Sequence, residues 1–563
     1  MKFKDFVYER PDIEKYQKQM TDLLSKIGED VDANTEIEAI EEYFRINDEL
    51  DSMATLVSIR NSLDTKDEFY QEEQDFFDEN GPKLQMYNNQ FSKKLIQSKN
   101  RQSLEKHFGE LIFKQAELQE KTFSEDIIPD LQKENRLSTK YSKLLAGAEI
   151  EFEGKTYNLT QMGPFLQSLD RETRHKAQLK TSEFFKENEK ELDEIYDEMV
   201  KTRHKMAKTL GYDNFVQLGY DRLGRTDYDA SDVKTYRDQV YQEVVPLAKE
   251  LVERKAKRIG IEDPKSYDLA LSFKSGNPTP KGDLKWQVNI AKNMYEEMSQ
   301  ETGEFFNYML EHELLELDSK PGKAGGGYCT YIPNYKSPFI FANFNGTSHD
   351  VNVLTHEAGH AFQIYSSRDL IPSYRWPTME AAEIHSMSME FLAWPWIDQF
   401  FKEDTDKYKY YHLDSALSFL PYGVTVDEFQ HEIYNNPNMS PDQRKDTWRK
   451  IEKKYLPYKD YDDDEFMEKG TFWFKQGHIF SVPFYYIDYT LAQVLAFQFF
   501  VLSQKNHEEA LEKYIKLCRL GGSKSFVDLV ESTGLKNPFK KGTIKSVIGP
   551  ISKFLENVND QDL

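Results

Sequence analysis

The hydrophobic and polar positions of this chain follow the period of amphipathic helices over much of its length. From residue 12 to about 145, Glu, Lys, Gln and Leu predominate and Gly and Pro are scarce. Apolar residues recur three and four positions apart there, as in Leu23, Leu24 and Ile27, which is the spacing of one helix face. We therefore predict a mainly α-helical protein.

Breaks in this pattern divide the rest of the chain. Residues 148–158, AEIEFEGKTYN, alternate around Gly154 and predict a short β segment. The helical period resumes from about 170 to 258, and the sequence SGNPTPKGD at 275–283 predicts a loop. Helix is predicted again from 350 to about 520.

The segment 322–350 differs in kind from the helical regions. Three consecutive glycines lie in it: Gly325, Gly326 and Gly327. Residues of high β-propensity follow from 338 to 344, which predicts a small sheet. We expect the strand at 338–346 to accept an extended peptide as an added strand, with the glycines letting that backbone come close. A purely structural turn is the alternative reading.

The length of the chain indicates more than one lobe. A chain of 563 residues is too long for a single compact core. We predict a helical N-terminal region at 1–150 and a larger region at 151–563 that carries the chemistry described below.

Composition and charge exclude several classes of partner. Apolar residues make up 39% and charged residues 30%, which is typical of a globular protein. The formal net charge is −24, whereas phosphate binding and acidic lipid surfaces require a basic face. We therefore expect neither nucleic acid nor membrane as a partner.

Cysteine usage and the terminal sequence suggest a compartment. Only two cysteines occur, and the first twenty residues contain no apolar signal core. The most apolar stretch, 485–502, is interrupted by Asp488, Gln493 and Gln498, so we interpret it as a buried helix and not a membrane span. A cytoplasmic protein is expected.

The most informative motif is His-Glu-Ala-Gly-His at 356–360. On a helix, His356 and His360 lie on nearly the same face and can bind one zinc ion. Glu357, on an adjacent part of the surface, can accept a proton from a water on that metal. The surrounding residues are apolar, and histidines and a glutamate are costly inside a buried helix unless they are paired or bind metal. A hydrogen-bonded core pair is the alternative.

A third ligand should come from another element. The best candidate is TMEAAEIHSMSMEFLAW at 378–394, an apolar helix with carboxylates at Glu380, Glu383 and Glu390, close to one face. The pattern alone does not choose among these three. His385 points elsewhere on the helix but remains a candidate.

Several of these motifs together resemble the thimet oligopeptidase and oligoendopeptidase F family of zinc peptidases, in its bacterial, Pz-peptidase-like branch. HEAGH resembles the zinc helix of that family, and EIHSMSMEF at 383–391 resembles its second helix. GKAGGGYC, GHIFSVPFYYIDYTLAQ at 477–493 and CRLGGSKS at 518–525 are similar to three further stretches. The resemblance covers roughly 150 to 545.

The resemblance implies roles for particular residues. It implies Glu383 as the third zinc ligand, because a serine follows it three residues later, and Glu390 as a carboxylate that orients a metal histidine. It implies that a histidine and two tyrosines of 477–493 bind substrate and stabilise the oxyanion. The candidates for these roles are His478, Tyr485, Tyr486 and Tyr489.

Spacing narrows the choice among the tyrosines. Tyr486 and Tyr489 are three residues apart and share a helical face, so we assign them with His478 to the reaction. Tyr485 is expected to face elsewhere and is kept as a substrate-binding candidate. Core aromatics with hydroxyls on backbone acceptors are the alternative.

The fold implied by the resemblance is a mainly helical, two-lobed oligopeptidase with zinc on the floor of a deep channel. We therefore predict a zinc-dependent oligoendopeptidase that cuts internal bonds of short peptides, with Glu357 as general base. The resemblance suggests collagen-derived peptides among the substrates. One alternative is a zinc carboxypeptidase or dipeptidase, for which the sequence offers no unique Arg or Lys to anchor a terminal carboxylate. The other is a non-catalytic helical peptide-binding protein with a structural metal. Oligomeric state is not predicted.

Overall fold

The structure is a computed structural model that describes residues 1–28, 31–159, 161–320, 322–324, 326–344 and 346–563. It divides into two compact units, each assembled from separate stretches of the chain. The first unit comprises Met1–Lys121, Thr279–Thr405 and Leu502–Leu535, and the second comprises Thr122–Pro278, Asp406–Val501 and Lys536–Leu563. The predicted mainly helical fold is confirmed. The boundary predicted at residue 150 stays a prediction.

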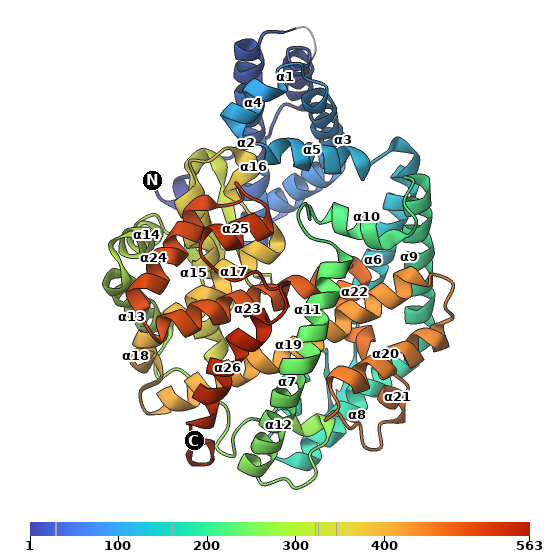
Figure 1. Ribbon diagram of the computed structural model, residues 1–563, viewed down its shortest axis with the longest axis vertical. Coiled ribbons are helices and arrows are strands. Elements are labelled where there is room, and N and C mark those ends of the chain that lie inside the picture. The colour runs from blue at the N-terminus through green and yellow to red at the C-terminus, as the bar shows by residue number, and fades with distance from the viewer. Residues whose placement is uncertain (29–30, 160, 321, 325, 345) are drawn as a thin grey trace. The chain divides into compact units, whose positions relative to one another are not determined.

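Helices form most of the first unit (Figure 1). They are α1 (Ile13–Leu24), α2 (Ala33–Leu63), α3 (Glu68–Ile96), α4 (Arg101–Phe108), α5 (Leu111–Lys121), α13 (Leu284–Met298), α14 (Gln300–Glu311), α15 (Ser348–Ser367), α16 (Pro372–Arg375), α17 (Met379–Leu392), α18 (Ile397–Phe401), α24 (His507–Leu520) and α25 (Phe526–Ser532).

The second unit is also helical, with one hairpin. Its elements are α6 (Ile128–Ala146), β1 (Ile150–Phe152), β2 (Lys155–Tyr157), α7 (Gly163–Leu166), α8 (Arg171–Glu187), α9 (Glu189–Thr209), α10 (Phe215–Arg222), α11 (Ala230–Glu243), α12 (Val245–Ile259), α19 (Thr405–Asn435), α20 (Pro441–Tyr455), α21 (Glu465–Glu468), α22 (Gly477–Ser481), α23 (Tyr486–Ser503) and α26 (Thr543–Glu556). β1 pairs antiparallel with β2, and Gly154 at φ +78° lies in the turn between them, as predicted for this segment.

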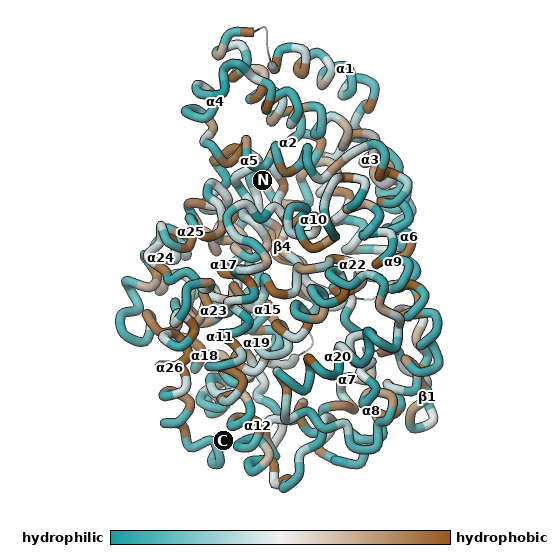
Figure 2. The backbone as a smooth tube through the Cα atoms, turned by 45° about the vertical axis from the view of Figure 1, so that its right-hand side comes forward, coloured by the Kyte–Doolittle hydropathy of each residue, from teal (hydrophilic) through white to brown (hydrophobic). Residues whose placement is uncertain are grey.

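The N-terminal helices show how local sequence sets these elements. Asp12, Asp32 and Asp67 each accept a backbone N–H in the first turn of α1, α2 and α3, respectively, which satisfies donors that a helix start leaves unpaired. The apolar face of α1 is buried, and Met20 is fully enclosed. Polar and apolar segments alternate along these helices in Figure 2. Each such buried side chain contributes about 1.5–3 kcal/mol.

A three-stranded sheet directly precedes α15 in the first unit. β4 (Tyr328–Ile332) pairs antiparallel with β5 (Ser337–Phe341), and β3 (Leu315–Glu316) pairs parallel with the other edge of β5. The small sheet predicted before the metal motif is therefore confirmed. The strand expected to accept a peptide was placed wrongly, because β5 is central and both its edges are occupied. A peptide can extend this sheet only at β4 or β3.

One described helix, α23, has the length and hydropathy that a membrane crossing requires, and 67% of that stretch is buried inside the structure. The same two properties are found in core helices. Its buried residues include Asp488 and Gln493.

Candidate active site

The two helices that carry the metal motif pack directly against each other. α15 bears HEAGH and α17 bears the three carboxylates, and they lie side by side in the first unit (Figure 1). Gly359 makes this possible, because a Cβ there would lie 2.6 Å from the carbonyl oxygen of His385 and 2.7 Å from Cα of Ser386. No larger residue fits without moving a helix.

The structure brings His356, His360 and Glu383 into one group. Their ligand atoms all lie within 4.8 Å of one another. Nε2 of His356 is 3.4 Å and Nε2 of His360 is 3.7 Å from Oε2 of Glu383, and the imidazole planes cross at 83°. Two nitrogens and one carboxylate oxygen converge here from two helices, and this is the donor set that catalytic zinc sites use.

Two further side chains orient these ligands. Nδ1 of His356 lies 2.8 Å from Oε1 of Glu390, so the ring can donate from Nδ1 and keep Nε2 available for a metal. The Ser386 hydroxyl donates to Oε2 of Glu383 at 3.0 Å. Glu390 therefore contacts one of the motif histidines, as the orienting role implied by the resemblance requires.

The surroundings of Glu383 and Glu357 shift the pKa values of these two carboxyl groups in opposite directions. Burial would raise the pKa of Glu383, but the neighbouring His356 and His360 and the Ser386 hydroxyl outweigh it and lower that pKa to about 2. Burial raises the pKa of Glu357 to about 7, because few groups compensate its charge. Glu383 thus stays ionised, as a metal ligand must, while Glu357 can take and return a proton near neutral pH.

The remaining candidates on α17 are not part of this group. His385 is fully buried beside Tyr514, whose hydroxyl donates to the His385 carbonyl at 2.9 Å. Burial lowers the pKa of His385 to about 4. Glu380 is also buried but does not belong to the three-residue group. Helical spacing alone left these alternatives open, and the packing of α15 against α17 brings Glu383 into the group with His356 and His360.

The glycine segment lies next to β4 in the first unit. Gly326 has a φ of +87°, which favours glycine, and its carbonyl accepts a hydrogen bond from Nδ2 of Asn343 at 2.9 Å. A Cβ at Gly327 would lie 3.4 Å from the Phe341 carbonyl oxygen. Gly325 lies outside the described residues. The assignment of these glycines to substrate binding stays a prediction.

The predicted histidine and tyrosines form a second group, in the second unit. The His478 ring lies 5.0 Å from that of Tyr486 and 5.7 Å from those of Tyr485 and Tyr489, between centroids. Tyr485 therefore does not face elsewhere. It precedes the first residue of α23, so helical spacing does not govern its direction.

Two residues that the sequence analysis missed determine the tautomer of His478. The Tyr422 hydroxyl donates to Oε1 of Gln476 at 2.7 Å, so the amide nitrogen of Gln476 faces Nδ1 of His478 at 2.8 Å and donates to it. The imidazole proton therefore sits on Nε2. Burial lowers the pKa of His478, which keeps the ring a neutral donor. Tyr422 is on α19, and no sequence signal links it to His478.

An unusual turn joins His478 to the tyrosines. Phe484 has a φ of +67°, a conformation that non-glycine residues rarely adopt. Its N–H donates to Oε1 of Gln430 at 3.0 Å, and its carbonyl accepts from Arg225 at 2.6 Å. A Cβ at Gly219 would lie 2.7 Å from the Phe484 ring. These contacts hold the backbone of Phe484 in place and thereby position the two residues that follow it, Tyr485 and Tyr486.

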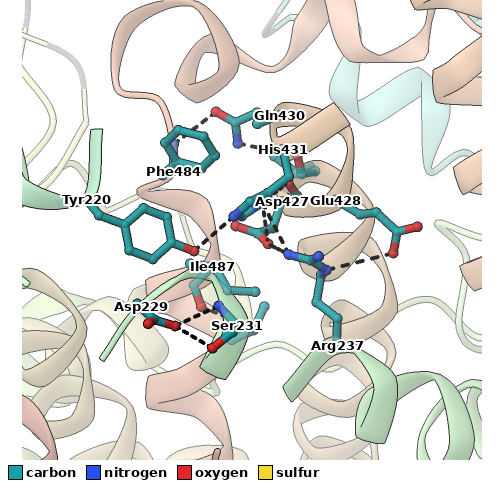
Figure 3. Close-up of polar contacts among 12 residues, drawn as sticks. Tyr220, Asp229, Ser231, Arg237, Asp427, Glu428, Gln430, His431, Phe484 and Ile487 are labelled. Atoms are coloured by element: carbon teal, nitrogen blue, oxygen red, sulfur yellow. Dashed lines mark hydrogen bonds and ion pairs between the residues drawn. The ribbon is translucent and has the colours of Figure 1, made fainter. Parts of the chain in front are cut away.

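A buried network of charged and polar side chains lies next to the Phe484 turn, as Figure 3 shows. His431 lies between Tyr220, 3.0 Å from its Nε2, and Asp427, 3.2 Å from its Nδ1. Arg237 pairs with the same Asp427. Burial would raise the pKa of Asp427, but His431 and Arg237 lower it to about 2. The Asp427 carboxylate and the Arg237 guanidinium are therefore both ionised in this network.

The CRLGGSKS stretch is structural in the first unit. The N–H of Gly522 donates to the Tyr374 carbonyl at 2.7 Å. A Cβ at Gly521 would lie 2.4 Å from that same oxygen, and one at Gly522 would lie 2.3 Å from the Trp376 carbonyl oxygen. Both glycines are required where α24 ends against the segment that leads into α17.

Comparison with known proteins places these features in a family context. Residues 165–547 match the model described as peptidase family M3, and residues 3–123 match the peptidase M3 N-terminal domain. An oligoendopeptidase F homologue from Borreliella burgdorferi is 26% identical over 444 residues, which cover 75% of this chain and 72% of that protein.

Solved structures are similar over the whole chain. The structure of PZ peptidase A with an inhibitor is 52% identical, covers 100% of both chains and superposes with a TM-score of 0.92. A provisionally named oligoendopeptidase F is 53% identical, also covers 100% of both chains and has a TM-score of 0.93.

Proposed function

Because this chain belongs to peptidase family M3 and is a metallo-endopeptidase, we propose that it hydrolyses internal bonds of short peptides with Glu357 as general base. The observation that carries the proposal is the convergence of His356, His360 and Glu383 beside the buried Glu357. The similarity to an oligoendopeptidase F homologue supports oligopeptides as the substrate class.

The residues present fit a zinc ion. His356 and His360 would hold it through Nε2 and Glu383 through a carboxylate oxygen, with the His356 ring oriented by Glu390. Three protein ligands leave a coordination position open, as catalysis requires. When bound, zinc supplies a Lewis acid that polarises a carbonyl group and increases the acidity of water.

Glu357 performs the proton transfers in this proposal. Its carboxylate accepts a proton from the attacking water and then donates that proton to the leaving amine. A pKa of about 7, raised by burial, suits both steps, because the group gains and loses a proton with little cost near neutral pH.

His478 and the tyrosines act on the oxyanion. His478 carries its proton on Nε2 because Gln476 donates to Nδ1, so it can donate a hydrogen bond without becoming charged. Burial raises the pKa of Tyr486, which keeps its hydroxyl protonated as a donor. We assign Tyr486 and Tyr489 with His478 to oxyanion stabilisation, and Tyr485, Gly326 and Gly327 to binding of the peptide.

The deciding experiment compares the wild type with Glu357→Gln at equal zinc content. We expect Glu357→Gln to retain zinc but to lose activity by about a thousandfold or more, since the base is removed while the ligands remain. Normal turnover by the fully loaded variant would refute the base assignment.

The substrates in this comparison should be internally quenched peptides with free and with blocked ends. An endopeptidase cuts both forms at the same internal bond. Exclusive cleavage of peptides with a free end would instead favour an exopeptidase.

A further inference from the structure

The second unit contains a cavity of about 560 Å³ whose wall has an unusual charge. Three lysines line it, Lys255, Lys459 and Lys475, and none of the described lining residues is Asp or Glu. The whole chain has 97 acidic and 73 basic residues. A wall with only positive charge in so acidic a protein is the composition expected of an anion-binding site.

Two of these lysines already have carboxylate partners that do not line the cavity. Nζ of Lys459 pairs with Glu452 at 3.0 Å, and Nζ of Lys255 lies 3.8 Å from Asp414. For Lys475, no hydrogen bond or carboxylate partner is found among the described residues. Its ammonium lies 3.7 Å from the centroid of the Phe472 ring. Lys475 is thus the lysine of this cavity that lacks a carboxylate partner among the described residues.

The surroundings of Lys475 make its charge costly. Burial by protein atoms and, to a smaller extent, the nearby Lys459 lower the pKa of Lys475 to about 7, and Glu452 acts in the opposite direction. The side chain is nevertheless accessible to solvent, so it is open to a ligand. An anion bound beside it would restore the charged form.

A second polar group in the cavity lacks a partner. Oε1 of Gln178 accepts from the Ser266 hydroxyl at 2.6 Å, which fixes the amide so that Nε2 is a donor. That buried Nε2 has no hydrogen-bond partner in the described part of the chain. A buried donor without a partner is destabilising, and a hydrogen-bond acceptor on a ligand would remove that cost.

Two residues that line the cavity also hold the His478 side chain. Gln476 and Tyr422 line it, and these are the residues that set the His478 tautomer. The remainder of the lining includes Leu166, Val252, Leu456 and Met467, which suit aliphatic side chains. The volume is in the range of a ligand subsite.

We propose that this cavity is a substrate subsite in which Lys475, assisted by Gln178, binds a carboxylate of the peptide. The inference rests on the proposed peptidase function. The carboxylate belongs either to the peptide's C-terminus or to an Asp or Glu side chain, and both present the same planar anion to an ammonium and an amide N–H.

The test uses four forms of one internally quenched heptapeptide. The parent has a free C-terminus and one Asp in its C-terminal half, and the others carry an amidated terminus, Asn in place of Asp, or both changes. For the zinc-loaded wild type, we expect kcat/KM to fall about tenfold to a hundredfold when the recognised carboxylate is neutralised. The fall should lie mainly in KM. Loss on amidation identifies the terminus, and loss on Asp→Asn identifies the side chain.

Lys475→Met should abolish this discrimination while the doubly neutral peptide is cut within about twofold of the wild-type rate. Lys475→Arg, which keeps the charge, should retain the discrimination. Lys469→Met is the matched control, because Lys469 is exposed and outside the cavity.

Equal kcat/KM of the wild type for all four peptides would overturn the inference. So would an equal loss on all four in Lys475→Met, since that pattern reports only structural damage. Failure of the proposed function looks different: the zinc-loaded wild type would then cut none of the four peptides.

Discussion

The metal group (His356, His360 and Glu383) and the His478 group (His478 with Tyr485, Tyr486 and Tyr489) are held in place in different ways. In the first unit, charged ligands are carried by two regular helices, α15 and α17, and one close contact at Gly359 sets their spacing. In the second unit, neutral donors surround an irregular turn at Phe484, and side chains from distant parts of the chain hold it. The charged ligands need only a short motif and a tight helix pair. The neutral donors need hydrogen bonds from many surrounding side chains to position them, because they do not share a metal ion that would bind them at one point.

The largest expected effect separates two buried carboxylates of α17. Glu383→Gln should lose zinc and, with it, activity by about a thousandfold or more, because a ligand is removed. Glu380→Gln is the matched control, since Glu380 is buried on the same helix but outside the metal group. Zinc content per chain and turnover are measured together. Loss of zinc from the control alone would reassign the third ligand.

A smaller effect is expected from the contact that sets the helix spacing. Gly359→Ala places a methyl group 2.6 Å from the His385 carbonyl oxygen. We expect a destabilisation of about 1–3 kcal/mol and zinc affinity weakened by about tenfold to a hundredfold.

The matched variant for Gly359→Ala is Gly549→Ala in α26, where a Cβ meets nothing within 4 Å. It should leave zinc affinity unchanged and not destabilise the fold. Denaturant unfolding and a competitive zinc titration distinguish the two variants. Unaltered zinc affinity in Gly359→Ala would contradict the role of helix spacing.

Substitution of the residues that hold His478 should lower kcat without changing the zinc content. Gln476→Leu removes the donor to Nδ1 of His478, so the Nε2–H tautomer is no longer favoured. We expect kcat to fall about tenfold, with zinc content unchanged. Tyr422→Phe, which frees the Gln476 amide to rotate, should give a weaker loss in the same direction. A change in KM alone would place Gln476 in substrate binding instead.

The smallest effect concerns stability at acid pH. The folded-state pKa of Asp427 is about 2, below its ordinary value of 3.8. Its ionised form therefore stabilises the fold fully above pH 3.8, and this contribution of about 2 kcal/mol is lost as pH falls towards 2. Asp427→Asn should be less stable than the wild type at pH 6, and the difference should shrink on acidification. A constant difference between pH 6 and pH 2 would show that Asp427 does not titrate as inferred.

Much of the architecture follows from local sequence. Aspartates before α1, α2 and α3, apolar spacing along each helix and the glycine turn of the hairpin are short-range signals, and the structure agrees with them. The strand order was not accessible in this way. β-propensity located β5, but its central position depends on β3, which is contributed by residues 315–316.

For the site, the sequence by itself determined the pair His356 and His360 with Glu357, because their spacing on one helix is a property of the helix alone. Only the tertiary structure decided that Glu383, and not Glu380 or His385, lies with the two histidines, since that placement depends on which face of α17 packs against Gly359. The His478 tautomer, the Phe484 turn and the Lys475 cavity are also decisions of the tertiary structure. Each depends on at least one side chain that is distant in sequence, such as Tyr422 for the His478 tautomer, and that reaches its place only when the second unit folds.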